Sequence, residues 1–136
     1  MATLPELRAL LAAELSAVTG LTVESTPPLD DATPGTGVVF TGPTRPGPRF
    51  GRQGRVTLQG VVVTGSEADE AAAETFVDAW SGPLLLALLG NPGGDFNGLT
   101  EHGPADASVE ARQLDLSVDG RALYALIVTV TLDVDL

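Results

Sequence analysis

The sequence predicts a single α+β domain with a largely antiparallel or mixed β-sheet, an N-terminal helix and a central helix pair packed on one face, and a long β-hairpin arm. Three observations predict this class. Apolar residues recur at helical spacing in two segments, β-branched runs separate those segments, and the chain ends in a long alternating stretch that follows a two-residue turn signal. A chain of 136 residues is long enough to bury one sizeable core.

The N-terminal helix is predicted to begin at a capping box. Thr3 stands three residues before Glu6, so each side chain can bond the backbone N–H of the other, and Pro5 is tolerated in the first turn. Gly20 stands where the chain is expected to leave the helix. The apolar stripe of this helix consists of Leu7, Leu10, Leu11, Leu15 and Val18.

Three strands are predicted in the next part of the chain. A short strand over 21–24 is followed by a proline-rich loop, because proline supplies no N–H to a ladder. A second strand starts at 38–40, and a β-branched run predicts a third over 55–64. The segment between them, residues 41–55, holds four of the seven arginines and no carboxylate. We expect it to form the long hairpin arm.

A pair of helices is predicted after residue 66. The first has an apolar face at spacing i, i+3, i+4 and i+7, formed by Ala73, Phe76, Val77 and Trp80. The sequence Ser81-Gly82-Pro83 is expected to end it and to start a short second helix over 84–89, because proline fits the first turn of a helix and not its interior.

The last third of the chain predicts a loop and a hairpin. Residues 90–107 have the composition of a flexible loop, whereas 114–118 alternate apolar and polar side chains, and Asp119-Gly120 is a strong hairpin-turn signal. In the final strand the apolar face is formed by Leu126, Val128, Val130, Leu132 and Val134, and the polar face by Thr129, Thr131, Asp133 and Asp135.

The composition narrows the possible partners and the compartment. With 18 acidic residues, seven arginines and no lysine, the net charge of −11 argues against general binding to nucleic acid or to an anionic membrane. The absence of cysteine removes disulfides and thiolate sites. No N-terminal signal pattern and no membrane-spanning run is present, so we expect the protein in the cytoplasm unless it is packaged into a larger assembly.

Few residues offer catalytic or ligand chemistry. His102 is the only histidine and lies in the predicted loop, where an exposed imidazole is expected. The glycine-rich run around Asp95 lacks the lysine of a phosphate loop and the spaced acidic ligands of a calcium loop, and Asp30 and Asp31 are expected to stay solvated. The sequence therefore predicts no enzyme and no catalytic, cofactor-binding or metal-binding residue.

Two charged sets are candidate interfaces with a neighbouring subunit. The segment 41–55 is either a solvated loop or a docking arm whose contacts are Arg45, Arg49, Phe50, Arg52 and Arg55. An acidic row on the first central helix is either its solvent face or a second interface, formed by Glu70, Glu74 and Asp78.

The order of these parts resembles the tail terminator proteins of long-tailed, siphovirus-type bacteriophages, especially those that infect high-GC actinobacteria. The stretches "LPELRALLAAEL", "STPP", "FGRQGRVTLQGVVV", "SEADEAAAETFVDAWSGP" and "DGRALYALIVTVTLDV" carry the resemblance over nearly the whole chain. The resemblance implies a non-enzymatic virion subunit that forms a hexameric ring on the tail tube, stops tube polymerisation and presents a face to the head-side connector.

Further expectations follow from that resemblance. If the ring surrounds the channel for the genome, Asp133 and Asp135 would face the lumen and repel DNA, which passes without specific binding. The predicted partners are other copies of the chain, the tail tube protein and a head-side connector or stopper protein, and the location is the virion tail or neck after assembly in the host cytoplasm. A head-side stopper is the alternative, followed by a small-molecule-binding domain with a pocket under the 90–107 loop.

Overall fold

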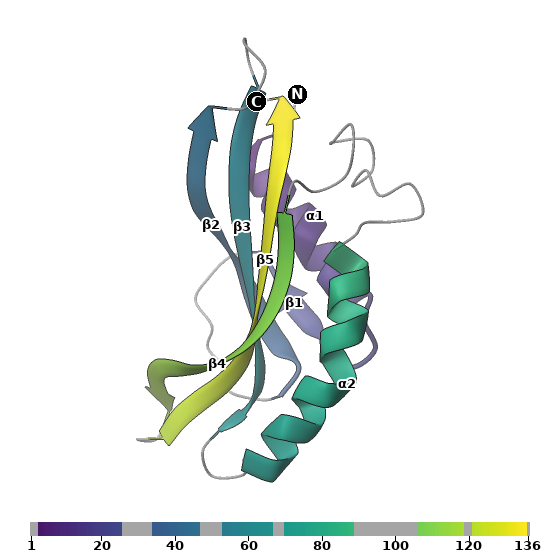
Figure 1. Cartoon of the computed structure of the whole chain (residues 1–136), viewed down its shortest axis with the longest axis vertical. Coiled ribbons are helices and arrows are strands. Elements are labelled where there is room, and N and C mark those ends of the chain that lie inside the picture. The colour runs from purple at the N-terminus through teal and green to yellow at the C-terminus, as the bar shows by residue number, and fades with distance from the viewer. Residues whose placement is uncertain are drawn as a thin grey trace.

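The computed structural model describes residues 3–25, 34–46, 53–66, 70–88, 106–118 and 121–135. Over these residues the chain forms a small α+β domain with a five-stranded sheet and two helices (Figure 1). In chain order the elements are α1 (Leu4–Ser16), β1 (Thr22–Glu24), β2 (Thr36–Pro46), β3 (Gln53–Ser66), α2 (Glu70–Leu88), β4 (Asp106–Val118) and β5 (Arg121–Asp135).

The sheet is mixed, as the sequence predicts. Its strand order is β1-β2-β3-β5-β4, with β1 parallel to β2 and every other neighbouring pair antiparallel. The longest ladder joins β3 to β5 and runs from the pair Gln53 and Asp135 to the pair Ser66 and Leu123. The last strand, β5, therefore lies inside the sheet, between β3 and β4.

Helix α1 confirms its predicted start and apolar stripe. The Thr3 hydroxyl accepts from the Glu6 N–H at 3.4 Å, and the Glu6 carboxylate accepts from the Thr3 N–H at 3.4 Å. Leu7, Leu11 and Leu15 are fully buried, because their spacing of four residues places them on one side of the helix. Helix α1 contacts β1, β2 and β3.

Helix α2 corrects the prediction of a central helix pair. The expected break at Ser81-Gly82-Pro83 is wrong, since one helix continues from Glu70 to Leu88 with Pro83 inside it. The physical reason is tertiary packing, because Trp80, Leu84 and Leu88 recur every four residues and all are buried, which offsets the hydrogen bond that Pro83 cannot make. Neither helix in the described ranges is long and apolar enough to cross a membrane.

The core lies between the sheet and the two helices. The five apolar residues predicted to alternate in β5 are all buried, and they join residues of α1 and α2 in one cluster. Thr129, Thr131 and Asp133 alternate with them and are partly exposed. The predicted two-sided character of β5 is therefore confirmed for these residues, and Asp133 is presented on the polar side.

Strand β4 begins earlier than predicted. Asp106 and Ala107 fall inside the expected loop, but they pair with Thr131 and Val130 of β5. Val109 and Ala107 pack against the core, which extends the strand toward the predicted loop. At its other end, Val118 lies opposite Arg121, which leaves Asp119 and Gly120 as the two connecting residues and confirms the hairpin.

Candidate assembly interface

A row of charged side chains crosses three strands at one end of the sheet. Arg45 of β2 lies opposite Arg55 of β3, and Arg55 lies opposite Asp133 of β5. The Arg55 guanidinium donates from Nε to Oδ1 of Asp133 at 2.8 Å and from Nη2 to Oδ2 at 3.0 Å. This two-point geometry fixes both side chains in the plane that a guanidinium and a carboxylate share.

The ion pair changes the protonation equilibria of both groups. The hydrogen bonds from Arg55 have the largest effect and lower the pKa of Asp133. Partial burial opposes them, and the positive charge of Arg55 adds a smaller lowering of the same pKa. The hydrogen bond to Asp133 and its negative charge raise the pKa of Arg55. Asp133 therefore stays ionised and offsets the repulsion between the facing arginines.

Arg45 extends this charged row toward the edge of a surface hollow. A one-residue bulge between Thr41 and Thr44 precedes Arg45 in β2, and Arg45 itself is exposed. The hollow has a volume of about 330 Å³, and its lining consists of Pro43, Arg45, Arg55, Thr57, Asp106 and Thr131. Among the residues that the structure describes, no hydrogen bond or ion pair is found for the Arg45 guanidinium. Arg45 can therefore meet an external carboxylate.

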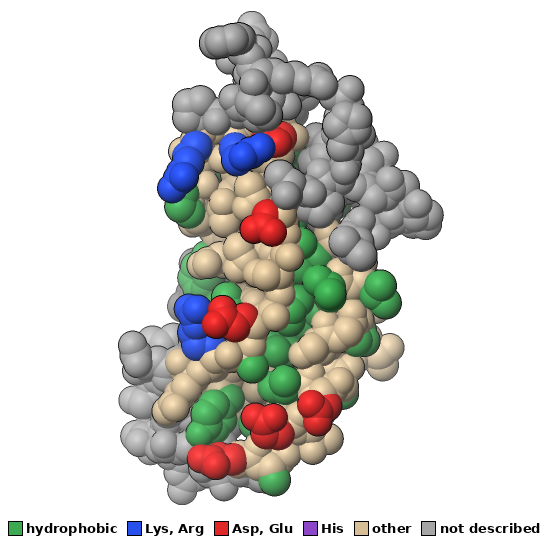
Figure 2. Space-filling model, viewed as in Figure 1, with side chains coloured by type: hydrophobic (Ala, Val, Ile, Leu, Met, Phe, Trp, Pro, Cys, Tyr) green, Lys and Arg blue, Asp and Glu red, His purple; other side chains and the backbone are tan. Residues whose placement is uncertain are grey.

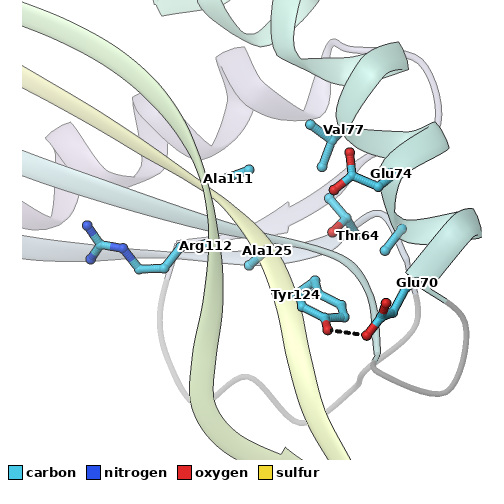
Figure 3. A pocket seen from close by; sticks show the side chains of 9 residues that line it. Thr64, Glu70, Glu74, Val77, Ala111, Arg112, Tyr124 and Ala125 are labelled. Atoms are coloured by element: carbon cyan, nitrogen blue, oxygen red, sulfur yellow. Dashed lines mark hydrogen bonds between the residues drawn. The ribbon is translucent and has the colours of Figure 1, made fainter.

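The acidic row on α2 divides into two parts. Glu70, Glu74 and Asp78 are all exposed, as expected for one face of a helix at four-residue spacing. Glu70 accepts a hydrogen bond from the Tyr124 hydroxyl at 3.0 Å, and Glu70 and Glu74 border a cavity between α2 and the β4–β5 hairpin (Figure 3). Asp78 lies one turn further along the helix. No sequence pattern indicated Tyr124 or the cavity residue Thr64 as site residues, because their positions depend on the register of the strands.

The two charged sets lie at opposite ends of the molecule. Arg55 is close to the start of β3, whereas Glu70 follows the end of that strand. The eleven residue-to-residue steps from Arg55 to Ser66 span about 35 Å at about 3.3 Å per step. Figure 2 shows blue side chains with red ones near them at the upper end, blue against red about halfway down, and red side chains without blue neighbours at the lower end, over the beginning of α2. One copy of the chain therefore cannot bring these two sets together.

The other predicted site residues are distributed as follows. Arg49, Phe50 and Arg52 lie outside the described residues, as do His102 and Asp95. Asp135 belongs to β5, with its backbone opposite Gln53. Asp133, which was expected to face a lumen, is bound to Arg55 within the same chain. Within the described ranges, no three His, Asp or Glu side chains are grouped so that they could hold a metal ion.

Comparison with known proteins adds no family assignment, because no family model and no curated protein matches this chain.

Proposed function

We propose that this protein is a structural subunit of a phage tail, a tail terminator, which forms a ring on the end of the tail tube, stops tube polymerisation and joins the tail to the head. The observation that carries the proposal is the separation of charge within the fold. Arg45 and Arg55 lie at one end of the sheet, and Glu70, Glu74 and Asp78 follow the other end.

Separated complementary patches favour contact between different ends of neighbouring copies. A contact that uses two different patches is heterologous, and it closes into a ring when the rotation between copies allows it. Arg45, which lies outside the Arg55–Asp133 pair, would meet the acidic helix face of the next copy, and the resemblance to tail terminators implies six copies in the ring. Carboxylates and guanidiniums also set the orientation of such a contact.

The proposal also includes two features of the architecture, which are the packing of both helices on one face of the sheet and the hairpin arm. Both helices pack on one face of the sheet, as supported by the Arg8 Nη1 hydrogen bond to the Thr41 hydroxyl at 2.8 Å and by the shared core of α1 and α2. The segment 41–55 forms an arm around the β2–β3 connection, supported by pairing that continues to Pro46 and Gly54. The arm would carry Arg49, Phe50 and Arg52 to the tail tube or to the neighbouring subunit.

Native mass spectrometry and electron microscopy test this function. The purified chain is measured alone and after mixing with tail tubes, and the expected result is a small ring that caps tube ends. A strict monomer that never caps tubes would overturn the proposal. A pull-down then assigns the role, because binding to the tube protein supports a terminator, whereas binding only to a portal or adaptor protein supports a head-side stopper.

A further inference from the structure

The cavity between α2 and the β4–β5 hairpin has a buried floor and a charged rim. Its volume is about 160 Å³, which is room for several waters at about 30 Å³ each. The floor includes Thr64, Ala73 and Ala125, which are nearly or fully buried. Glu70 and Glu74 stand at the exposed rim. A ligand that enters would therefore meet carboxylates first and a hydroxyl beneath them.

Thr64 is placed in this cavity by an irregularity of the sheet. Val63 lies opposite Ala125 and Gly65 lies opposite Tyr124, so Thr64 is the extra residue of a β-bulge. Gly65 also faces α2, because a Cβ added there would lie 3.0 Å from Cβ of Ala73. Bulged residues lie outside the regular ladder, and bulges commonly re-aim side chains at functional sites.

The Thr64 hydroxyl is a buried polar group without a partner. Thr64 is fully buried, and its Oγ1 makes no hydrogen bond within the described part of the chain. A hydroxyl that loses water on folding and gains no partner makes the folded state less stable than it would be with a partner. A ligand that donates a hydrogen bond to Oγ1 would remove this cost.

The carboxylates of Glu70 and Glu74 at the rim favour a positively charged ligand. Figure 3 shows Thr64 between the side chains of Glu70 and Glu74, whereas the Arg112 guanidinium points away from them. Arg112 instead bonds Glu110 through Nη2 and Oε2 at 3.1 Å. Among the described residues, Arg112 therefore pairs with neither of the two rim carboxylates.

We propose that this cavity, with Thr64 at its floor and Glu70 and Glu74 at its rim, binds a guanidinium group. A guanidinium carries five N–H donors in one plane, so it can serve carboxylates on one edge and a hydroxyl on another. An ammonium has three donors around one nitrogen and cannot spread them over the same width. Thr64 accepts one N–H, and the carboxylates at the rim balance the charge.

The occupant is an arginine side chain from a second copy of this chain. The chain has seven arginines and no lysine, so every cationic side chain that it offers is a guanidinium. Arg45 is exposed, and it lies at the end of the sheet opposite the cavity, which places it on the flank that a neighbouring copy would present. This choice of occupant rests on the proposed ring, whereas the affinity of the cavity for guanidinium does not.

Ethylguanidinium and ethylammonium chloride test the cavity directly on the full chain. Titration followed by ¹⁵N NMR is expected to show binding of ethylguanidinium with shifts around Thr64 and Tyr124, and at least about tenfold weaker binding of ethylammonium. Thr64→Val keeps the shape and removes the hydroxyl, and Glu74→Gln removes one charge. Each is expected to weaken ethylguanidinium binding about tenfold or more. Asp78→Asn, on the same helix, is the matched control and should leave it unchanged.

The possible results test the guanidinium site and the proposed ring independently. Binding of ethylguanidinium that depends on Thr64 and Glu74 supports the site even if the chain stays monomeric, a result that would reject the ring and its arginine donor. Rings that form while ethylguanidinium fails to bind would overturn the site and leave the proposed function standing. Equal binding by wild type and Thr64→Val also overturns it. Rings that weaken with Arg45→Gln and with Glu74→Gln, with no further loss when the two changes are combined, identify the occupant.

Discussion

Arg55 and Asp133 lie directly opposite each other on β3 and β5, joined by two hydrogen bonds of 2.8 and 3.0 Å. From the sequence alone, Arg55 is expected to contact a neighbouring subunit and Asp133 to face a lumen. Their pairing gives both an intramolecular role, because it links the starting end of β3 to the finishing end of β5. Of the described arginines in the segment 41–55, Arg45 is the one that does not take part in this ion pair.

The pKa of Asp133 should depend on Arg55. Because the pKa of Asp133 is lowered in the folded chain, the pair stabilises the fold above the unfolded-state value near 4, and this contribution is lost as the pH falls through the folded value. In Arg55→Gln the pKa of Asp133 is expected to rise toward its ordinary value. Carboxyl ¹³C NMR titration measures it directly, and an identical titration curve in the variant would contradict the assigned cause.

Arginine reversals should separate assembly from folding. Changing Arg49 and Arg52 to Glu is expected to weaken ring formation while the melting temperature stays nearly unchanged, because the proposed arm would direct these charges to a partner and not into the core. Arg55→Glu should lower both ring formation and the melting temperature, since it places a second carboxylate against Asp133. Sedimentation velocity and calorimetry on each variant make the comparison. A large drop in melting temperature for the Arg49 and Arg52 variant would show that these residues pack within their own domain.

Proline at position 83 should reduce the stability of α2. It lies inside the helix and is exposed, so Pro83→Ala restores a backbone N–H without removing a core contact. The free energy of unfolding is expected to rise by up to about 3 kcal/mol. Gly82→Ala is the matched control, because nothing lies within 4 Å of an added Cβ, and it should add about 1 kcal/mol. Urea denaturation measures both, and a loss of stability in Pro83→Ala would speak against a continuous helix.

Two leucines of α2 should differ strongly in their contribution to the core. Leu84 is 0% exposed and Leu86 is 68% exposed. Leu84→Ala is expected to lower the free energy of unfolding by about 2–5 kcal/mol, because it leaves a cavity against the sheet. Leu86→Ala should change it by less than about 0.5 kcal/mol. Equal effects in thermal or urea unfolding would mean that the buried face of the helix is assigned incorrectly.

Local signals predicted the elements of this fold well. The capping box of Thr3 and Glu6 and the alternation in β5 are short-range patterns, and the structure contains both of them. The pairing of Val118 with Arg121 agrees with the predicted two-residue connection. The predicted helix break at Pro83 is wrong. The local preference of proline to end a helix is outweighed by the burial of Trp80 and Leu84, and this burial depends on packing against the sheet.

The candidate sites were less accessible to sequence reasoning. Arg55 and Asp133 are 78 residues apart, and only the register of β3 against β5 brings them together. The position of Thr64 depends on a bulge that has no distinct signature in its neighbours, and Tyr124 meets Glu70 only through tertiary packing. Helix periodicity did reveal Glu70 and Glu74 as neighbours, because four-residue spacing suffices for that inference.

The place of β5 in the sheet has a consequence for how the domain reaches its native state. During synthesis, β5 leaves the ribosome after the other described elements, yet it lies between β3 and β4 and supplies five residues to the core cluster that it shares with α1 and α2. β3 is therefore without its longest partner while residues 67–120 are made. Pairing between such distant segments raises the contact order, so folding is expected to be slow for a chain of this size and to finish only after the full domain has emerged.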